Sequence, residues 1–248
     1  MMRGLILSNH RSAVRRTFRR LLLRGSLSVG ALSLLTSCDL QDDDGVDRLL
    51  HAMSHWNDKA QAALFSRNRL AQTYRAADIT EPFPFDAYYP IDQVRIVDGE
   101  TWKLEVTGLV SDRRPWSLRE LRELPQDSQI TRHICIEGWS AVGEWGGIRF
   151  SDFLQRIGAD TRARFVRFEC ADDYRSSIDM ETALHPQTLL ALTFRGQPLA
   201  PQYGFPAKLR VPTKLGFKNP KHIVGLEVTN IYPGGFWEDY GYNWFSGL

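Results

Sequence analysis

Hydrophobic and polar residues follow two different patterns along this 248-residue chain. Residues 49–75 carry apolar side chains at helical spacing and contain no Pro or Gly, which predicts a long helix. Beyond residue 100 the apolar residues come in short alternating runs, which is typical of strands. The predicted strands span residues 102–110, 129–137, 165–170, 189–194, 208–211 and 223–229.

Two short helices are predicted between these strands. Ser117 and Glu120 have the spacing of a capping box, and Ser151 is expected to cap a helix over 152–157 that Gly158 ends. Helices are too few and too unevenly spaced for regular βαβ units, so the pattern favours an α+β fold with a mixed sheet. Residues 79–90 contain three prolines and several aromatic residues, which indicates an ordered loop.

The first 37 residues have the pattern of a signal peptide. The sequence Arg15-Arg16-Thr17-Phe18 precedes an apolar run over 25–35 and resembles a twin-arginine export signal. Eleven residues are fewer than the roughly 20 that span a bilayer. The run ends in a lipobox-like Leu-Thr-Ser before Cys38, which predicts lipidation of Cys38, although an incidental cysteine is the alternative. An acidic spacer and the long helix follow over 38–78.

Charge is distributed unevenly along the chain. The formal net charge is +2, from 31 basic and 29 acidic residues, but seven of the basic residues lie in the first 24 positions. The remainder has 24 basic and 29 acidic residues, a net charge of −5. This balance argues against a general nucleic-acid-binding protein.

The stretch RHICIEGWSAVGEW, residues 132–145, places Cys135 among polar groups. In a strand, His133, Cys135 and Glu137 share one face, and positive charge on Arg132 and His133 would favour the Cys135 thiolate. A thiolate beside an imidazole and a carboxylate forms one wall of a metal site. Packing of Cys135 in the core, or a disulfide with Cys170, are the alternatives.

Other chemistry-bearing motifs are sparse. The chain has no zinc-ligand spacing, HExxH, GxSxG, Walker or GxGxxG motif, so a metal at Cys135 would need further ligands from a cofactor. The segment KLRVPTKLGFKNPKHI, residues 208–223, is rich in cations around two turns. Such a segment suits a phosphate, and a solvated basic edge is the alternative.

Four segments together resemble the molybdopterin-binding domain of the sulfite-oxidase family: RHICIEGWSAVGEW, ALHPQTLLAL, VPTKLGFKNPKHI and GGFWEDYGYNWFSGL. The resemblance covers residues 79–248 and is closest to the exported bacterial branch, which includes methionine-sulfoxide reductases. It implies a single domain of the sulfite-oxidase type without the C-terminal dimerisation domain of the oxidases. It also implies a molybdenum cofactor (Mo-molybdopterin) as the redox group.

The resemblance assigns roles to particular residues. Cys135 matches the thiolate that binds molybdenum, and Glu137 matches an acid beside the metal. The remaining assignments are cofactor contacts at Asp86, Cys170, Tyr203, Lys208, Lys218 and Lys221, and a place in the substrate pocket for Tyr242. Lys208 stands where the family usually has arginine, and Asp86 where it has asparagine. His185 is expected to be structural.

The implied activity is oxygen-atom transfer, most simply the reduction of a sulfoxide or a similar oxide. Sulfite dehydrogenation within the same family and a non-catalytic membrane-tethered binding lipoprotein are the alternatives. A carboxylate at Glu137 would repel sulfite. The expected partners are a small-molecule or protein-bound oxidised substrate and, as electron partner, a membrane haem protein or a periplasmic cytochrome. The expected location is the periplasm, at the outer face of the inner membrane.

Overall fold

The computed structural model describes residues 43–248, so the predicted signal sequence and Cys38 lie outside the described residues. The chain divides into two units, residues 1–52 and 53–248, and all strands of the described residues lie in the second. In the described part, no helix has the length and apolar character needed to cross a membrane.

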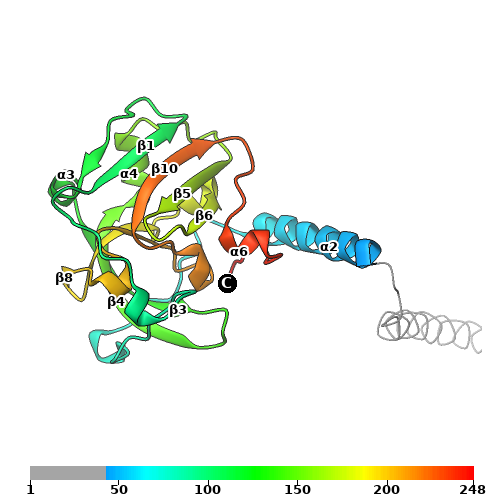
Figure 1. Ribbon diagram of the computed structural model, residues 1–248, viewed down its shortest axis with the longest axis horizontal. Coiled ribbons are helices and arrows are strands. Elements are labelled where there is room, and N and C mark those ends of the chain that lie inside the picture. The colour runs from blue at the N-terminus through cyan, green and yellow to red at the C-terminus, as the bar shows by residue number, and fades with distance from the viewer. Residues whose placement is uncertain (1–42) are drawn as a thin grey trace, which may run out of the picture. The chain divides into compact units, whose positions relative to one another are not determined.

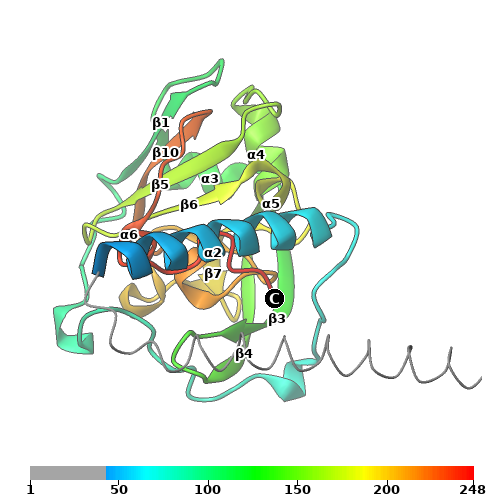
Figure 2. The ribbon, with the colours of Figure 1, turned by 90° about the vertical axis from the view of Figure 1, so that its right-hand side faces the viewer.

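The first sheet is mixed, with strand order β2-β1-β10-β5-β6. Its strands β1, β10, β5 and β6 are labelled in Figure 1. Its strands are β1 (Lys103–Gly108), β2 (Trp116–Ser117), β5 (Phe165–Cys170), β6 (Arg175–Asp179) and β10 (Ile223–Thr229). Strands β1 and β10 are parallel and the other pairs are antiparallel. Figure 2 shows β1, β10, β5 and β6 side by side in this order.

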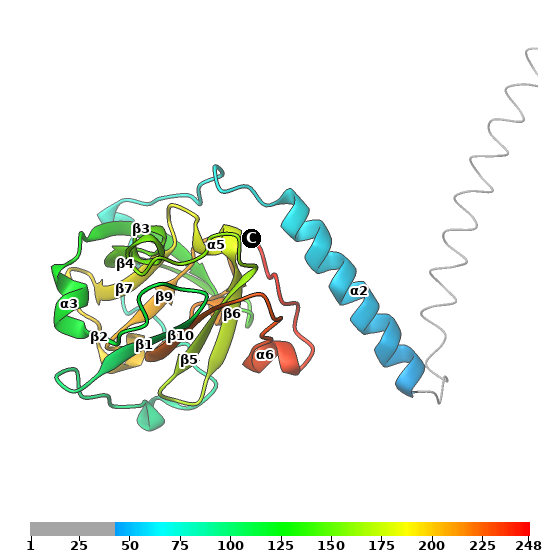
Figure 3. The same cartoon turned by 90° about the horizontal axis from the view of Figure 1, so that it is seen from above.

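The second sheet is antiparallel, with strand order β3-β4-β7-β8 and β9 also paired with β7. Its strands are β3 (Asp127–Ile134), β4 (Ser140–Arg149), β7 (Leu189–Phe194), β8 (Gln197–Pro198) and β9 (Lys208–Arg210). Strands β3, β4, β7 and β9 lie together in Figure 3. The predicted α+β fold with a mixed sheet is therefore confirmed.

Short helices connect the strands. They are α3 (Leu118–Glu123), α4 (Phe150–Arg156), α5 (Met180–Ala183) and α6 (Phe236–Asp239), with 3-10 turns at Ala76–Asp78, Ile91–Gln93, Pro201–Tyr203 and Gly216–Lys218. The main core packs Leu104, Phe150, Phe153, Phe168 and Leu209 with other apolar side chains of both sheets. A smaller cluster around Phe83, Trp145 and Phe194 anchors the loop that precedes β1.

The long N-terminal helix is shorter than predicted. Helix α2 spans Asp43–Leu64, because Ser66 and Asn68 form a turn and Thr73 then bridges Thr131 of β3. The regularly spaced apolar side chains of this helix are not all buried, since Trp56 is 72% exposed.

Two further differences have local causes. The sequence pattern did not identify β4, because its glycines weaken the strand pattern; at Gly147 the chain passes so close to Leu190 that a side chain would clash. Ser151 does not cap α4: the helix begins at Phe150, whose amide is bound by the Thr188 carbonyl at 2.8 Å. The capping box at Ser117 and Glu120 is confirmed.

Candidate active site

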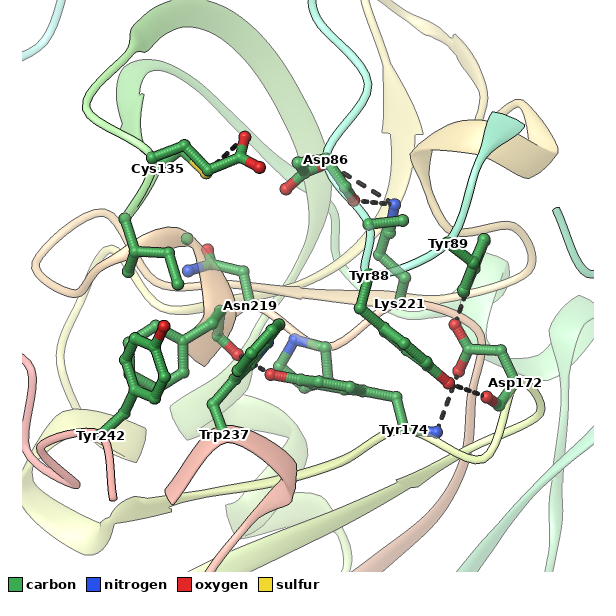
Figure 4. A pocket seen from close by; sticks show the side chains of 16 residues that line it. Asp86, Tyr88, Tyr89, Cys135, Asp172, Tyr174, Asn219, Lys221, Trp237 and Tyr242 are labelled. Atoms are coloured by element: carbon green, nitrogen blue, oxygen red, sulfur yellow. Dashed lines mark hydrogen bonds and ion pairs between the residues drawn. The ribbon is translucent and has the colours of Figure 1, made fainter. Parts of the chain in front are cut away.

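A cavity of about 400 Å³ opens where several loops meet (Figure 4). The segments that form it are 86–89, the turn after β3, the loop between β5 and β6, residues 216–221 and the C-terminal segment that contains α6. Its volume is in the range of small-ligand and cofactor sites. The lining side chains labelled in Figure 4 are Asp86, Tyr88, Tyr89, Cys135, Asp172, Tyr174, Asn219, Lys221, Trp237 and Tyr242.

Cys135 follows the last residue of β3 and begins a tight turn. Its amide donates to the Trp139 carbonyl at 2.9 Å, and the Gly138 amide donates to the Cys135 carbonyl at 3.2 Å. Gly138 has φ +92°, a left-handed conformation that glycine adopts without strain. The predicted strand therefore ends before Glu137, and the turn rather than strand alternation brings the Glu137 Oε2 atom to 3.7 Å from Cys135 Sγ.

Up to Cys135, the side chains of β3 alternate between two cavities as predicted for a strand. Arg132 and Ile134 line a second cavity of about 670 Å³, whereas Cys135 lines the first and His133 contacts Asp86 there. The strand thus directs one cysteine and one imidazole toward the candidate site.

The electrostatic prediction for Cys135 is wrong in one respect. Burial raises the pKa of the thiol and the charges of Glu137 and Asp86 raise it further, although a backbone hydrogen bond opposes them. Arg132 faces the other cavity, and the imidazole of His133, whose pKa burial lowers, is directed at Asp86, so neither stabilises the Cys135 thiolate. A bound metal ion would stabilise it, because a coordinating thiol is deprotonated.

A buried group of charged side chains adjoins Cys135. Asp86 Oδ2 lies 3.0 Å from His133 Nε2 and 3.9 Å from Lys208 Nζ, and Asp86 Oδ1 lies 3.5 Å from Lys221 Nζ. Burial opposes ionisation of Asp86, but Lys208, His133 and Lys221 outweigh it and hold the pKa of the carboxyl below its usual value. Asp86 is therefore a carboxylate among cations.

Lys208 is fully buried, and its Nζ atom has no hydrogen-bond partner. Burial lowers its pKa to about 8, while Asp86 acts in the opposite direction. The ammonium lies 4.8 Å from the centre of the Trp145 ring. Arg210 is engaged differently, because its guanidinium donates to Asn219 Oδ1 at 3.0 Å and to the Arg132 carbonyl at 2.7 Å. The ammonium of Lys208 is therefore an unsatisfied cation beside Asp86.

Four predicted cofactor contacts lie outside the cavity lining: Lys208, described above, and Lys218, Tyr203 and Cys170. Lys218 is buried in an ion pair with Glu238, and burial lowers its pKa. Tyr203 packs against Phe83 and donates its hydroxyl to the Phe83 carbonyl at 3.2 Å. Cys170, at the end of β5, is buried, which raises its thiol pKa well above the usual value.

Both described cysteines, Cys135 and Cys170, are free, so the alternative with a disulfide is not found in the structure. His185 is structural as expected: its ring accepts from the Gln187 amide at 3.2 Å and its Nε2 lies 3.2 Å from the Arg69 carbonyl.

The C-terminal segment supplies an aromatic wall. Tyr242 is 43% exposed and packs against Trp237, with ring centres 5.2 Å apart. Across the cavity, Tyr174 donates to the Phe217 carbonyl at 2.7 Å (Figure 4). Tyr88 lies near these aromatic side chains, with its ring centre 5.8 Å from that of Tyr174. The aromatic composition of residues 79–90 and 236–245 indicated burial, but not a shared cavity.

The cavity fits an anionic cofactor that carries its own metal ligands. Within residues 43–248, no group of three or more His, Cys, Asp or Glu side chains is placed to hold a metal ion. The thiol of Cys135 and the buried ammonium of Lys221 instead line a single space, and the ammonium of Lys208, which has no hydrogen-bond partner, lies beside Asp86 in that lining. This combination is compatible with a protein that binds an organic, anionic group carrying a metal, held by Cys135 and the two lysines.

The family comparison agrees with this class. Residues 91–237 match the family model described as oxidoreductase molybdopterin binding domain, and the chain belongs to that family. It is therefore a molybdopterin-dependent oxidoreductase, as the sequence resemblance implied.

Similar proteins include a putative protein-methionine-sulfoxide reductase subunit YedZ1 from Azospira oryzae, 58% identical over 92% of this chain and 87% of that protein. The catalytic subunit MsrP of protein-methionine-sulfoxide reductase from Xanthomonas campestris is 32% identical over 63% of this chain, which spans 54% of that protein. Among solved structures, the sulfane dehydrogenase SoxCD from Paracoccus pantotrophus aligns with a TM-score of 0.52 at 20% identity. The alignment covers 56% of this chain and 40% of the SoxCD chain, and at this identity it supports the fold alone.

Proposed function

We propose that this protein transfers an oxygen atom from a sulfoxide, with methionine sulfoxide in proteins as the substrate class, and that Cys135 binds the molybdenum of its cofactor. The arrangement that carries the proposal is the thiol of Cys135 open to a cavity beside buried ammonium groups. The names of the similar proteins support the substrate class.

When bound, the cofactor supplies a metal that exchanges an oxygen atom and two electrons with the substrate. The chain supplies the rest: Cys135 provides the thiolate, and Lys221 and Lys208 hold the anionic part of the cofactor. Sulfoxide reduction consumes two protons and releases water. Glu137 Oε2, 3.7 Å from Cys135 Sγ and bonded to Trp139 Nε1 at 2.9 Å, is placed to hold one of those protons.

The cavity favours a neutral sulfur substrate over sulfite. Glu137 lies exposed beside Cys135 and repels an anion, whereas a sulfoxide carries no net charge. Trp237 and Tyr242 offer aromatic surfaces, which make favourable contacts with thioether sulfur. Assays with artificial electron carriers separate the alternatives: a methionine-sulfoxide peptide should be reduced, and faster oxidation of sulfite would favour sulfite dehydrogenation.

Metal analysis tests the thiolate assignment directly. Protein produced with its N-terminal segment intact should contain about one molybdenum per chain and the pterin, and Cys135→Ser should lose the metal because hydroxyl is a poor ligand for it. Cys170→Ser is the matched control for loss of a thiol and should retain molybdenum. Metal-free wild-type protein, or equal metal content in Cys135→Ser, would contradict the proposal.

The proposal includes export and membrane attachment. Residues 1–37 would direct twin-arginine export of the folded protein, and lipidated Cys38 would hold it at the outer face of the inner membrane. A membrane haem protein or a periplasmic cytochrome would then deliver electrons. Reduced membranes alone should re-reduce the purified protein, and Cys38→Ser should release it from the membrane fraction. Re-reduction only by a soluble donor would exclude the membrane partner.

A further inference from the structure

The side chain of Asp86 occupies a position that an anionic ligand would be expected to take. Lys208 from β9, Lys221 from the loop before β10 and His133 from β3 converge on its carboxylate. In the described part of the chain, Asp86 is the one carboxylate within ion-pair distance of either lysine. Its side chain is only 13% exposed, and it lines the cavity that contains Cys135.

The charges around Asp86 are loosely paired. The ammonium groups of Lys221 and Lys208 lie 3.5 and 3.9 Å from its oxygens, beyond the 2.7–2.9 Å that is usual for a charge-assisted hydrogen bond. Asp86 Oδ1 and Lys208 Nζ both lack hydrogen-bond partners. His133 Nε2 lies 3.0 Å from Oδ2 but in an orientation that leaves both His133 nitrogens without a hydrogen bond. The cations are therefore spaced for an anion larger than one carboxylate.

The backbone on both sides of Asp86 is held in place. Tyr203 donates to the Phe83 carbonyl at 3.2 Å, and Tyr89 donates to Asp172 Oδ2 at 2.8 Å. Lys221 also donates to the Asp86 carbonyl. Rotation of the Asp86 side chain into the cavity can therefore remove the carboxylate from both lysines without movement of the loop, while Lys221 keeps its hydrogen bonds to the Asp86 and Gln202 carbonyls.

We propose that Asp86 is a built-in counter-ion that competes with the phosphate of the cofactor for Lys208 and Lys221, so that cofactor binding displaces its side chain. This inference rests on the proposed cofactor site. Before binding, Asp86 compensates buried positive charge, which is costly when unpaired. After binding, its negative charge opposes the anionic ligand. One residue thus stabilises the cofactor-free protein and weakens retention of the cofactor.

The two effects predict opposite consequences of Asp86→Asn, which keeps the size of the side chain and removes its charge. In full-length protein produced without the cofactor, the variant should unfold several degrees lower than wild type but bind inorganic phosphate at least about tenfold more tightly by calorimetry, because one nearby repulsive charge is gone. In cofactor-loaded protein, the pterin should dissociate more slowly. If Asp86 served only as a structural ion pair, Asp86→Asn would lower the stability of the cofactor-free protein and also speed dissociation of the pterin.

Matched variants make the test specific. Glu81→Gln removes an exposed carboxylate from the same loop, paired with Arg195 at 2.8 Å, and should change neither property. If Asp86→Asn does not fold, the double variant Asp86→Asn with Lys208→Gln restores the charge balance; it should fold and bind phosphate less tightly than wild type. Where Asp86→Asn does fold, the two substitutions should show strong coupling.

Unchanged or weaker phosphate binding by folded Asp86→Asn would overturn the inference. So would independent behaviour of positions 86 and 208 in the double variant. Molybdenum content of the wild-type protein distinguishes this failure from failure of the proposed function: metal-containing wild type with unchanged phosphate binding refutes only the role of Asp86. Metal-free wild type refutes the cofactor site itself.

Discussion

Lys214 is a buried cation whose cost can be measured as a pH dependence of stability. Its side chain is 1% exposed, and its Nζ atom lies 3.5 Å from Asp179 Oδ2 and has no hydrogen-bond partner. The rings of Phe245 and Phe65 lie 2.8 and 5.4 Å from it. Burial and the nearby charge of Lys218 lower the pKa of Lys214 to about 7, although Asp179 and Asp58 act in the opposite direction.

The size of the effect follows from proton binding by the two states. The unfolded chain keeps the proton on Lys214 up to about pH 10.5, whereas the folded protein releases it near pH 7. Raising the pH through this window therefore favours the folded state. Each pKa unit corresponds to about 1.4 kcal/mol. The contribution of Lys214 to the free energy of unfolding should rise by about 2 kcal/mol between about pH 7 and pH 9.

Urea unfolding of wild type and Lys214→Met over this pH range measures the contribution. The variant should be more stable than wild type near pH 7, and the difference should shrink as pH rises, because methionine fills the site without a charge. Lys103→Met, at an exposed position of β1, should show no such pH-dependent difference. A constant difference between wild type and Lys214→Met across the range would refute the assigned charge state.

Two further substitutions test the geometry near the site and at a helix start. Gly216→Ala should lower pterin content and destabilise the protein by about 1–3 kcal/mol, because the new Cβ would lie 2.6 Å from Nε2 of buried His133. Pterin fluorescence measures the first effect and thermal unfolding the second. Wild-type values in both assays would refute the close packing at Gly216. Ser117→Ala should cost about 1 kcal/mol in urea unfolding, because Ser117 caps Glu120, and a neutral effect would show that the cap is unimportant.

Local patterns were sufficient where neighbours in sequence determine the structure. The strands over 165–170, 189–194 and 223–229 agree with β5, β7 and β10, and the Ser117 capping box has the predicted partners. Strand β4 was missed because it is buried on both faces and rich in glycine, so it lacks alternation. The helix predicted over 49–75 extends past the end of α2 at Leu64, because the apolar spacing continues into a segment that pairs with β3 instead.

The sequence alone predicted that Cys135 lies among polar residues in a strand, since a strand needs only alternating side chains. The turn that ends the strand at Ile134 was not predicted. The positive segment over 208–223 was also visible as a local excess of charge. Neither pattern specified which charged side chains would form ion pairs in the folded protein.

Tertiary structure decided the pairings that make the site. Asp86 contacts Lys221, 135 residues later in the chain, and the cavity takes side chains from five separate segments. Burial then set their charge states: it lowered the pKa of Lys208 and raised that of Cys135, against the expectation from neighbouring residues. Desolvation and charge pairing act through space, so they depend on which segments the fold brings together rather than on spacing along the chain.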